Sequence, residues 1–166
     1  YGDTFVVPAP DIKTSGARIM SLEDPTKKMS KSAGSAGSYI ALTDTDAEIT
    51  KKIKRAVTDS GSDVKSAPDK PALTNLLGIY SLLSNEPVAE IEDRYAGKGY
   101  GAFKTDLATI VVDAVRPIRE KLLDYEANPD YAVGVLAGGA DRARAHAEPK
   151  MKIVRERMGL TGHNAR

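Results

Sequence analysis

The chain of 166 residues fits one ordinary domain, and its 41% hydrophobic residues are enough to build a core. A formal charge of +1 gives no global basic field for nucleic acid, so any such site must come from local clustering. The absence of cysteine excludes disulfides and thiolate metal sites, and two histidines, His146 and His163, are too few for a histidine-based zinc site or a convincing catalytic triad.

Residues 1–25 have the composition of an extended or irregular segment, punctuated by Pro8, Pro10 and Gly16. The short run Phe5–Val7 is typical of a strand. The start has no initiator methionine and no signal-peptide pattern, and no apolar run in the chain reaches membrane-spanning length. We therefore expect a cytoplasmic protein with no membrane partner, and the C-terminal part of a longer one.

A lysine- and serine-rich loop follows, out to about Ser38, with the sequence DPTKKMSKS at its start. Lysine ammonium groups suit phosphate oxygens, and Lys28 and Lys31 are three positions apart with a serine between them. Such a loop could close over a polyphosphate and stabilise charge on a departing pyrophosphate. On spacing alone, a solvated basic surface loop is the better-supported interpretation.

From Tyr39 onward the pattern is helical. Thr45 and Glu48 predict a capping box before an apolar stripe that includes Ile49 and Ile53. A second helix follows Pro71, with a strongly apolar face, and a shorter one follows Pro87. The glycines between residues 97 and 101 predict an interhelical turn rather than a phosphate-binding loop, because the strand–loop–helix context is missing.

The longest helical pattern begins near Phe103, and Pro117 is expected to kink or restart it. Asn128-Pro129 predicts the cap and first turn of the next helix, which should stop at Gly138-Gly139. The last helix should run from about Ala140 to Met158, with a bend or break at Pro149 and a stop at Gly159. The fold class predicted is mainly α, a bundle of five or six helices preceded by the terminal segment of a Rossmann-like α/β domain.

The string Lys28-Met29-Ser30-Lys31-Ser32 is identical to the KMSKS signature of class I aminoacyl-tRNA synthetases. With its flanks, GARIMSLxDPTKKMSKS closely resembles the bacterial tryptophanyl-tRNA synthetases, and the resemblance continues in order through NLLGIY at residues 75–80 and RPI at residues 116–118. A tyrosyl-type synthetase is the alternative within the class, and these flanks argue against it. The resemblance covers nearly the whole chain.

This resemblance implies an ATP-dependent ligase that activates tryptophan and transfers it to tRNA. It assigns Lys28 and Lys31 the catalytic role of holding ATP phosphates and stabilising the pyrophosphate. The implied ATP-binding residues are Ile19, Lys28, Met29, Ser30, Lys31 and Ser32, with Ile19 packing against adenine. It implies no metal site and no tightly bound cofactor, with ATP and Mg²⁺ entering as substrate. The family often has an aspartate directly after the signature, where this chain has Ala33.

The division expected is residues 1–38, the end of the catalytic domain with its loop, and residues 39–166, a helical anticodon-binding domain. The implied partners are tRNA(Trp), ATP and tryptophan, with a homodimer for the full-length enzyme. No His-Ile-Gly-His-type signature occurs in the 166 residues. We therefore expect this chain alone to be inactive in adenylation. A non-catalytic helical RNA-binding module, or an intramolecular scaffold without RNA affinity, stays open as an alternative.

Two basic surfaces are candidates for contacting tRNA. One is the helix around Lys51, Lys52, Lys54 and Arg55, which the residues alone favour as the solvated side of an amphipathic helix. The other is the C-terminal helix, with Arg142, Arg144, Lys150, Lys152, Arg155 and Arg157. Which of these residues read bases cannot be separated from phosphate contacts by sequence.

Overall fold

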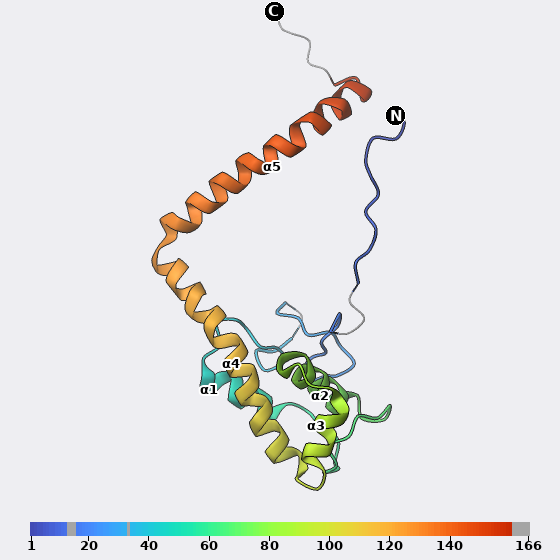
Figure 1. The fold of residues 1–166 in the computed structure, drawn as a ribbon, viewed down its shortest axis with the longest axis vertical. Helices are drawn as coiled ribbons and strands as arrows, with labels where there is room; N and C mark the ends of the chain where they lie inside the picture. Colours follow the sequence, from blue (N-terminus) through green and yellow to red (C-terminus); the bar gives the residue numbers. More distant parts are fainter. Residues whose placement is uncertain (13–15, 33, 161–166) are drawn as a thin grey trace, which may run out of the picture. The chain divides into compact units, whose positions relative to one another are not determined.

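A computed structural model describes residues 1–12, 16–32 and 34–160. Within these ranges the chain forms five helices and no strand, so the prediction of a mainly α body is confirmed (Figure 1). The chain divides into two compact units, one of residues 12–123 and one of residues 1–11 with 124–166. No described helix is both long and apolar enough to cross a membrane. The predicted domain boundary at residue 38 stays a prediction.

Helix α1, Asp46–Arg55, begins where its capping box predicts. The Thr45 hydroxyl accepts a hydrogen bond from the Glu48 N–H at 3.3 Å, and the Glu48 carboxylate accepts from the Thr45 N–H at 2.7 Å. Two donors at the helix start are thereby satisfied. Ile49 and Ile53 bury the opposite face of the helix completely.

Helices α2, Pro71–Ser84, and α3, Val88–Tyr95, form an antiparallel pair beside this helix (Figure 1). The turn between them passes through Asn85, whose φ of 58° is the left-handed conformation that asparagine tolerates. The predicted interhelical turn is confirmed at residues 96–98, where Gly97 has a φ of +74°, but residues 99–101 already belong to the next helix.

Helix α4, Gly99–Ala127, packs its first half on α2 and α3 through an aromatic cluster, and Ile49 and Ile53 of α1 belong to the same buried core. The ring of Phe103 stacks on that of Tyr80 with centroids 5.9 Å apart and meets the edge of Tyr95 at 5.4 Å. The Tyr95 hydroxyl donates to Asp106 at 2.6 Å, and burial, with this bond, raises the pKa of Tyr95. Tyr80 and Tyr95 are therefore core residues.

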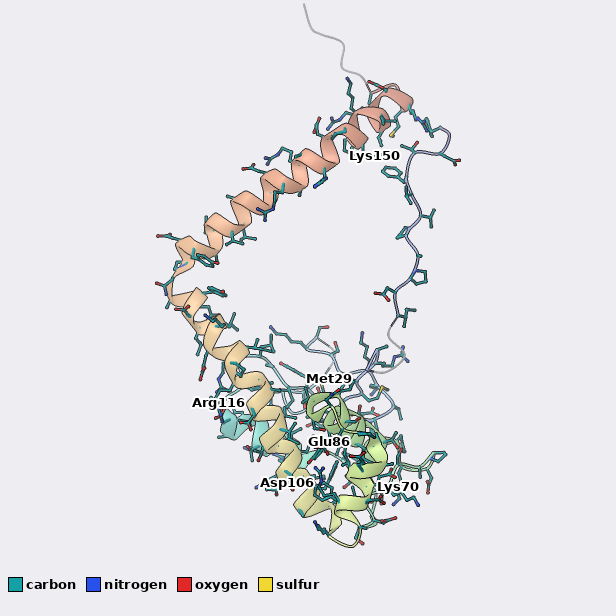
Figure 2. All side chains as sticks on the ribbon, in the orientation of Figure 1. Met29, Lys70, Glu86, Asp106, Arg116 and Lys150 are labelled. Carbon is teal, nitrogen blue, oxygen red and sulfur yellow. The ribbon has the colours of Figure 1, made fainter. Side chains whose placement is uncertain are left out.

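Pro117 does not restart α4, which is helical on both sides of it. The arginines around it attach this stretch to the start of α1 (Figure 2). Arg116 donates to Asp46 at 2.9 Å, and Arg119 donates to Asp46 at 2.7 Å and to the Asp44 carbonyl at 2.6 Å. The two guanidinium groups, Arg119 first, lower the pKa of Asp46.

The other unit contains helix α5, Pro129–Arg157, which runs through both Gly138-Gly139 and Pro149. The predicted stop and break are wrong, because these glycines keep negative φ and cost only about 1 kcal/mol each against alanine. Pro129 occupies the first turn as predicted, but the Asn128 side chain does not cap α5 and donates to the Asp124 carbonyl instead. Gly159, with a φ of +71°, follows the helix end as predicted.

The segment 1–11 forms no strand, so the expectation for Phe5–Val7 is wrong, and these three side chains are exposed. The start of the segment lies against the end of α5 (Figure 2). Arg157 donates to the carbonyls of Tyr1 and Asp3, and Lys150 donates to the carbonyl of Thr4 at 2.9 Å.

Candidate functional site

The signature begins on one arm of a small antiparallel hairpin. The Ser21 N–H donates to the Lys27 carbonyl at 2.9 Å, and the Met29 N–H donates to the Ile19 carbonyl at 2.9 Å. These two bonds flank the directly opposed pair Met20 and Lys28. Ile19 and Met29, both predicted to bind ATP, are therefore next to each other across the hairpin.

The hairpin reverses direction in the turn formed by Asp24-Pro25-Thr26-Lys27. The Lys27 N–H donates to the Asp24 carbonyl at 3.0 Å, and the Asp24 carboxylate accepts from the Thr26 hydroxyl at 2.6 Å and from its N–H at 3.1 Å. Lys27 pairs with the same carboxylate at 2.9 Å. The Thr26 hydroxyl first, and then Lys27, lower the pKa of Asp24 to about 2. Lys27 is thus occupied in the turn.

Lys28 and Lys31 differ from Lys27 in their surroundings. Both side chains are exposed, and neither ammonium group has a hydrogen-bond or ion-pair partner among the residues that the structure describes. Met29 and Ser30 are half-buried, and the hydroxyls of Ser30 and exposed Ser32 lie 3.3 Å apart. The structure therefore holds the start of the signature in the hairpin and leaves both lysine charges available to a ligand.

The chain after the signature returns to the hairpin. The Leu22 N–H donates to the Ser38 carbonyl at 3.0 Å, and the Ser35 hydroxyl donates to the Glu23 carboxylate. A side chain at Gly37 would displace the Glu23 carboxylate from its present position. Ala33, the position where the family often has an aspartate, lies outside the described residues.

A polar hollow of about 160 Å³ lies between the hairpin and the returning loop, lined on one side by Lys28 and Ser30 and on another by Glu23, Asp24 and Ser35. Ile19 and Met29 line a separate open hollow of about 410 Å³, whose other walls are apolar residues of α2, α4 and the loop around Leu42. The hairpin therefore has a charged surface and an apolar surface.

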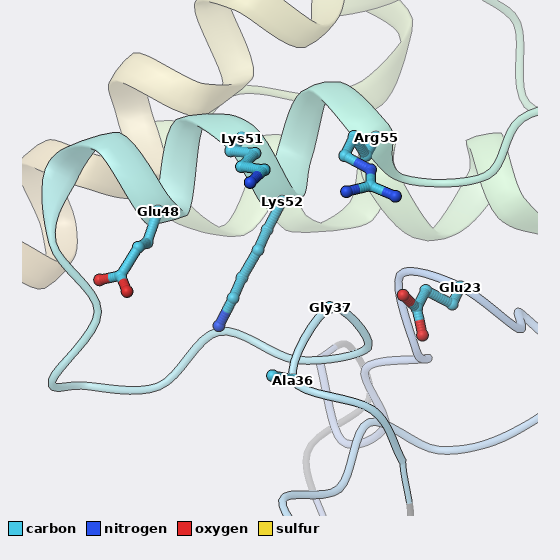
Figure 3. Close-up of a pocket in the computed structure, with 7 residues that line it drawn as sticks. All are labelled: Glu23, Ala36, Gly37, Glu48, Lys51, Lys52 and Arg55. Carbon is cyan, nitrogen blue, oxygen red and sulfur yellow. The ribbon is translucent and has the colours of Figure 1, made fainter.

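Four side chains of α1 form the wall of a third hollow, of about 330 Å³, with Glu23 and Gly37 of the loop opposite (Figure 3). The ammonium group of Lys52 has partners within the protein, because it pairs with Asp44 at 2.5 Å and lies over the ring of Tyr39. Lys51 and Arg55 are exposed and have no ion-pair partner among the described residues. Glu48 moderates their positive charge, so this surface is of mixed sign.

Four basic side chains of α5 have partners within its own unit. Arg144 pairs with Asp141 at 2.8 Å and Arg155 with Glu148 at 3.0 Å, while Lys150 and Arg157 bind the segment 1–4. His146 is exposed on this helix, and His163 lies outside the described residues. No cluster of metal-ligating side chains occurs within residues 1–12, 16–32 and 34–160.

Sequence reasoning did not assign a role to Asn75, on α2. Its side-chain amide accepts from the Met20 N–H at 2.8 Å and donates to the Met20 carbonyl at 2.9 Å. The two residues are 55 positions apart, so no local pattern reveals the pair. The only signal available was a polar residue directly before the buried Leu76 and Leu77.

A family model described as tRNA synthetases class I (W and Y) matches residues 3–116. The chain belongs to this synthetase family. Tryptophan–tRNA ligase 2 of Streptomyces avermitilis is 44% identical over 96% of the synthetase chain and 48% of the relative. Tryptophan–tRNA ligase of Bacillus subtilis is 45% identical with the same coverage. The chain thus spans about half the length of the curated relatives it matches.

Solved synthetase structures agree with this assignment. The tryptophanyl-tRNA synthetase of Mycoplasma pneumoniae superposes with a TM-score of 0.77 at 29% identity, over 93% of this chain and 47% of that one. The Campylobacter jejuni enzyme, described as a complex with ADP and tryptophan, gives 0.64 at 30% identity over 86% and 44%. The family resemblance seen in the signature and its flanks is confirmed.

Proposed function

We propose that the chain is the C-terminal part of a tryptophan–tRNA ligase, and that its signature loop binds the phosphates of ATP. The observation that carries this proposal is the pair of exposed ammonium groups of Lys28 and Lys31 on an otherwise hydrogen-bonded hairpin and loop. Support comes from curated relatives of that name and from a solved relative described with ADP and tryptophan.

In the proposed reaction the tryptophan carboxylate attacks the α-phosphorus of ATP, with Mg²⁺ entering on the nucleotide. The bond from that phosphorus to its bridging oxygen breaks, and pyrophosphate leaves with the electron pair. Lys28 and Lys31 would stabilise the negative charge that grows on this leaving group. Ile19 and Met29 would offer the apolar side of the hairpin to the adenine ring, and Ser30 and Ser32 would hydrogen-bond phosphate oxygens.

The proposal is tested in a chimera in which residues 1–166 replace the matched half of the Bacillus subtilis ligase. We expect tryptophan-dependent exchange of pyrophosphate into ATP, with no exchange when tyrosine is supplied instead. A folded chimera without any exchange contradicts the proposal.

For tRNA, we propose a phosphate contact on the described surfaces that keep unpaired cations. These are Arg142 and Lys152 on α5, and Lys51 and Arg55 on α1, none of which has an ion-pair partner among the described residues. Binding through phosphates predicts an affinity that falls steeply with salt. A filter-binding titration of tRNA(Trp) against the isolated chain at two salt concentrations measures it, and undetectable binding at low salt favours the scaffold alternative.

A further inference from the structure

The hairpin that carries the signature is too small to hold its own position. It consists of two short arms joined by two backbone hydrogen bonds, from Ser21 to Lys27 and from Met29 to Ile19. A two-stranded hairpin of this size is at best marginally stable in water. Something outside the hairpin must therefore hold its place against the helices.

Part of that support comes from Leu22, which is buried in the core and whose carbonyl accepts from the Val57 N–H at 2.8 Å. The backbone geometry shows a second support, at Met20. Met20 and Lys28 form a non-hydrogen-bonded antiparallel pair, so the N–H and the carbonyl of Met20 point away from the partner arm. Outward-pointing groups of an edge strand need a partner. The Asn75 side chain satisfies both groups, at 2.8 and 2.9 Å, in the way that an added strand would.

Asn75 is itself held by the helical core. It lies on α2 directly before Leu76 and Leu77, which are 1% and 0% exposed. The connection therefore runs from the buried face of α2, through the amide of Asn75, to the backbone of Met20, and across the hairpin to Lys28. Met29, labelled in Figure 2 on the second arm of the hairpin, lines one hollow together with Ile79 and Leu82 of α2.

We propose that Asn75 is a positioning residue, which fixes the hairpin on α2 so that Lys28 meets the ATP phosphates in the geometry that catalysis needs. The proposal rests on the function proposed above for the loop. It predicts that the loss of the Asn75 side chain raises the KM for ATP and lowers the catalytic rate. The affinity for tryptophan should not change.

Two measurements test it, and the first needs no activity. In the 166-residue chain, Asn75→Ala removes both bonds to Met20, and we expect hydrogen exchange at the Met20 and Met29 amides to become roughly tenfold faster. Asn128→Ala is the matched control, since this asparagine also donates to a backbone carbonyl but lies in the other unit. If hydrogen exchange at these two amides is unchanged in Asn75→Ala, the proposal is overturned, even if the loop binds ATP as proposed.

The second measurement uses the chimera with the Bacillus subtilis ligase. We expect Asn75→Ala to lower kcat of tryptophan-dependent exchange by about tenfold and to raise the KM for ATP, with the KM for tryptophan unchanged. If this variant fails to fold, Asn75→Asp keeps the side-chain shape but replaces the donor to the Met20 carbonyl with a charged acceptor, and the same split is expected. Unchanged kinetics, or equal losses for both substrates, overturn the proposal. An inactive unsubstituted chimera instead contradicts the proposed function.

Discussion

Three neighbouring lysines, Lys27, Lys28 and Lys31, carry the same charge in the signature segment but have different surroundings. Lys27 pairs with Asp24 in the hairpin turn, although its side chain remains 74% exposed. Exposed pairs of this kind contribute little to stability. Lys28 and Lys31 have no such partner among the described residues. Identical residue types thus divide into a turn residue and two candidate ligands for phosphate.

The turn itself gives a titration that can be measured. The depressed pKa of Asp24, about 2, means that its charged form is favoured in the folded chain. Its stabilising contribution is therefore complete above the ordinary pKa of 3.8 and is lost as the pH falls through about 2. We expect Thr26→Ala to raise the pKa of Asp24 further than Lys27→Ala does, because the Thr26 hydroxyl is its strongest partner.

Side-chain carboxyl chemical shifts recorded by NMR against pH measure this directly. An Asp24 that titrates near 3.8 in the unsubstituted chain would show that the turn does not form as described.

At the scale of elements, α1 depends on its capping box. Thr45→Ala removes the acceptor for the Glu48 N–H and the side-chain donor to the Glu48 carboxylate. We expect a loss of about 1 kcal/mol in the free energy of unfolding, from urea titration followed by circular dichroism. Thr43→Ala is the control, because this exposed threonine makes no side-chain hydrogen bond within the described residues. Equal effects of the two substitutions would count against the cap.

In helix α5, by contrast, a substitution is expected to stabilise the helix. Gly139 has helical φ, and an added Cβ would have only an ordinary contact, 3.9 Å from Arg142. Gly139→Ala should stabilise the helix by about 1 kcal/mol and slow hydrogen exchange in α5. Gly97→Ala should destabilise the other unit, since Gly97 has a φ of +74°, which alanine adopts only with strain. Faster exchange in α5 of Gly139→Ala would mean that the helix breaks there.

These elements show which features a sequence reveals. The starts of α1, α2 and α3 follow from local signals, namely a capping box, Pro71 and Pro87. The continuity of α5 does not, because glycine and proline penalties of a few kcal/mol are small enough for a long helix to absorb. The signature lysines were found by resemblance. The bond from Asn75 to Met20 joins residues 55 apart and needed the structure.

For the whole molecule, about half of the length of the curated relatives is present. The sequence has no His-Ile-Gly-His-type signature. In the function proposed above, the loop acts only on the phosphate end of ATP. We therefore expect the isolated 166-residue chain to give no tryptophan-dependent exchange between ATP and pyrophosphate. Robust exchange by the purified chain would contradict the division of the active site that we propose.

We propose above that the charges of Lys28 and Lys31 act on the departing pyrophosphate. The most direct measurement is the single-turnover rate of tryptophanyl-adenylate formation by the Bacillus subtilis chimera carrying Lys31→Ala, beside Lys27→Ala. We expect the Lys31 variant to lose roughly a hundredfold in rate with tryptophan affinity little changed, and the Lys27 variant to match the unsubstituted chimera. A normal rate with weakened tryptophan binding in Lys31→Ala would contradict the claim.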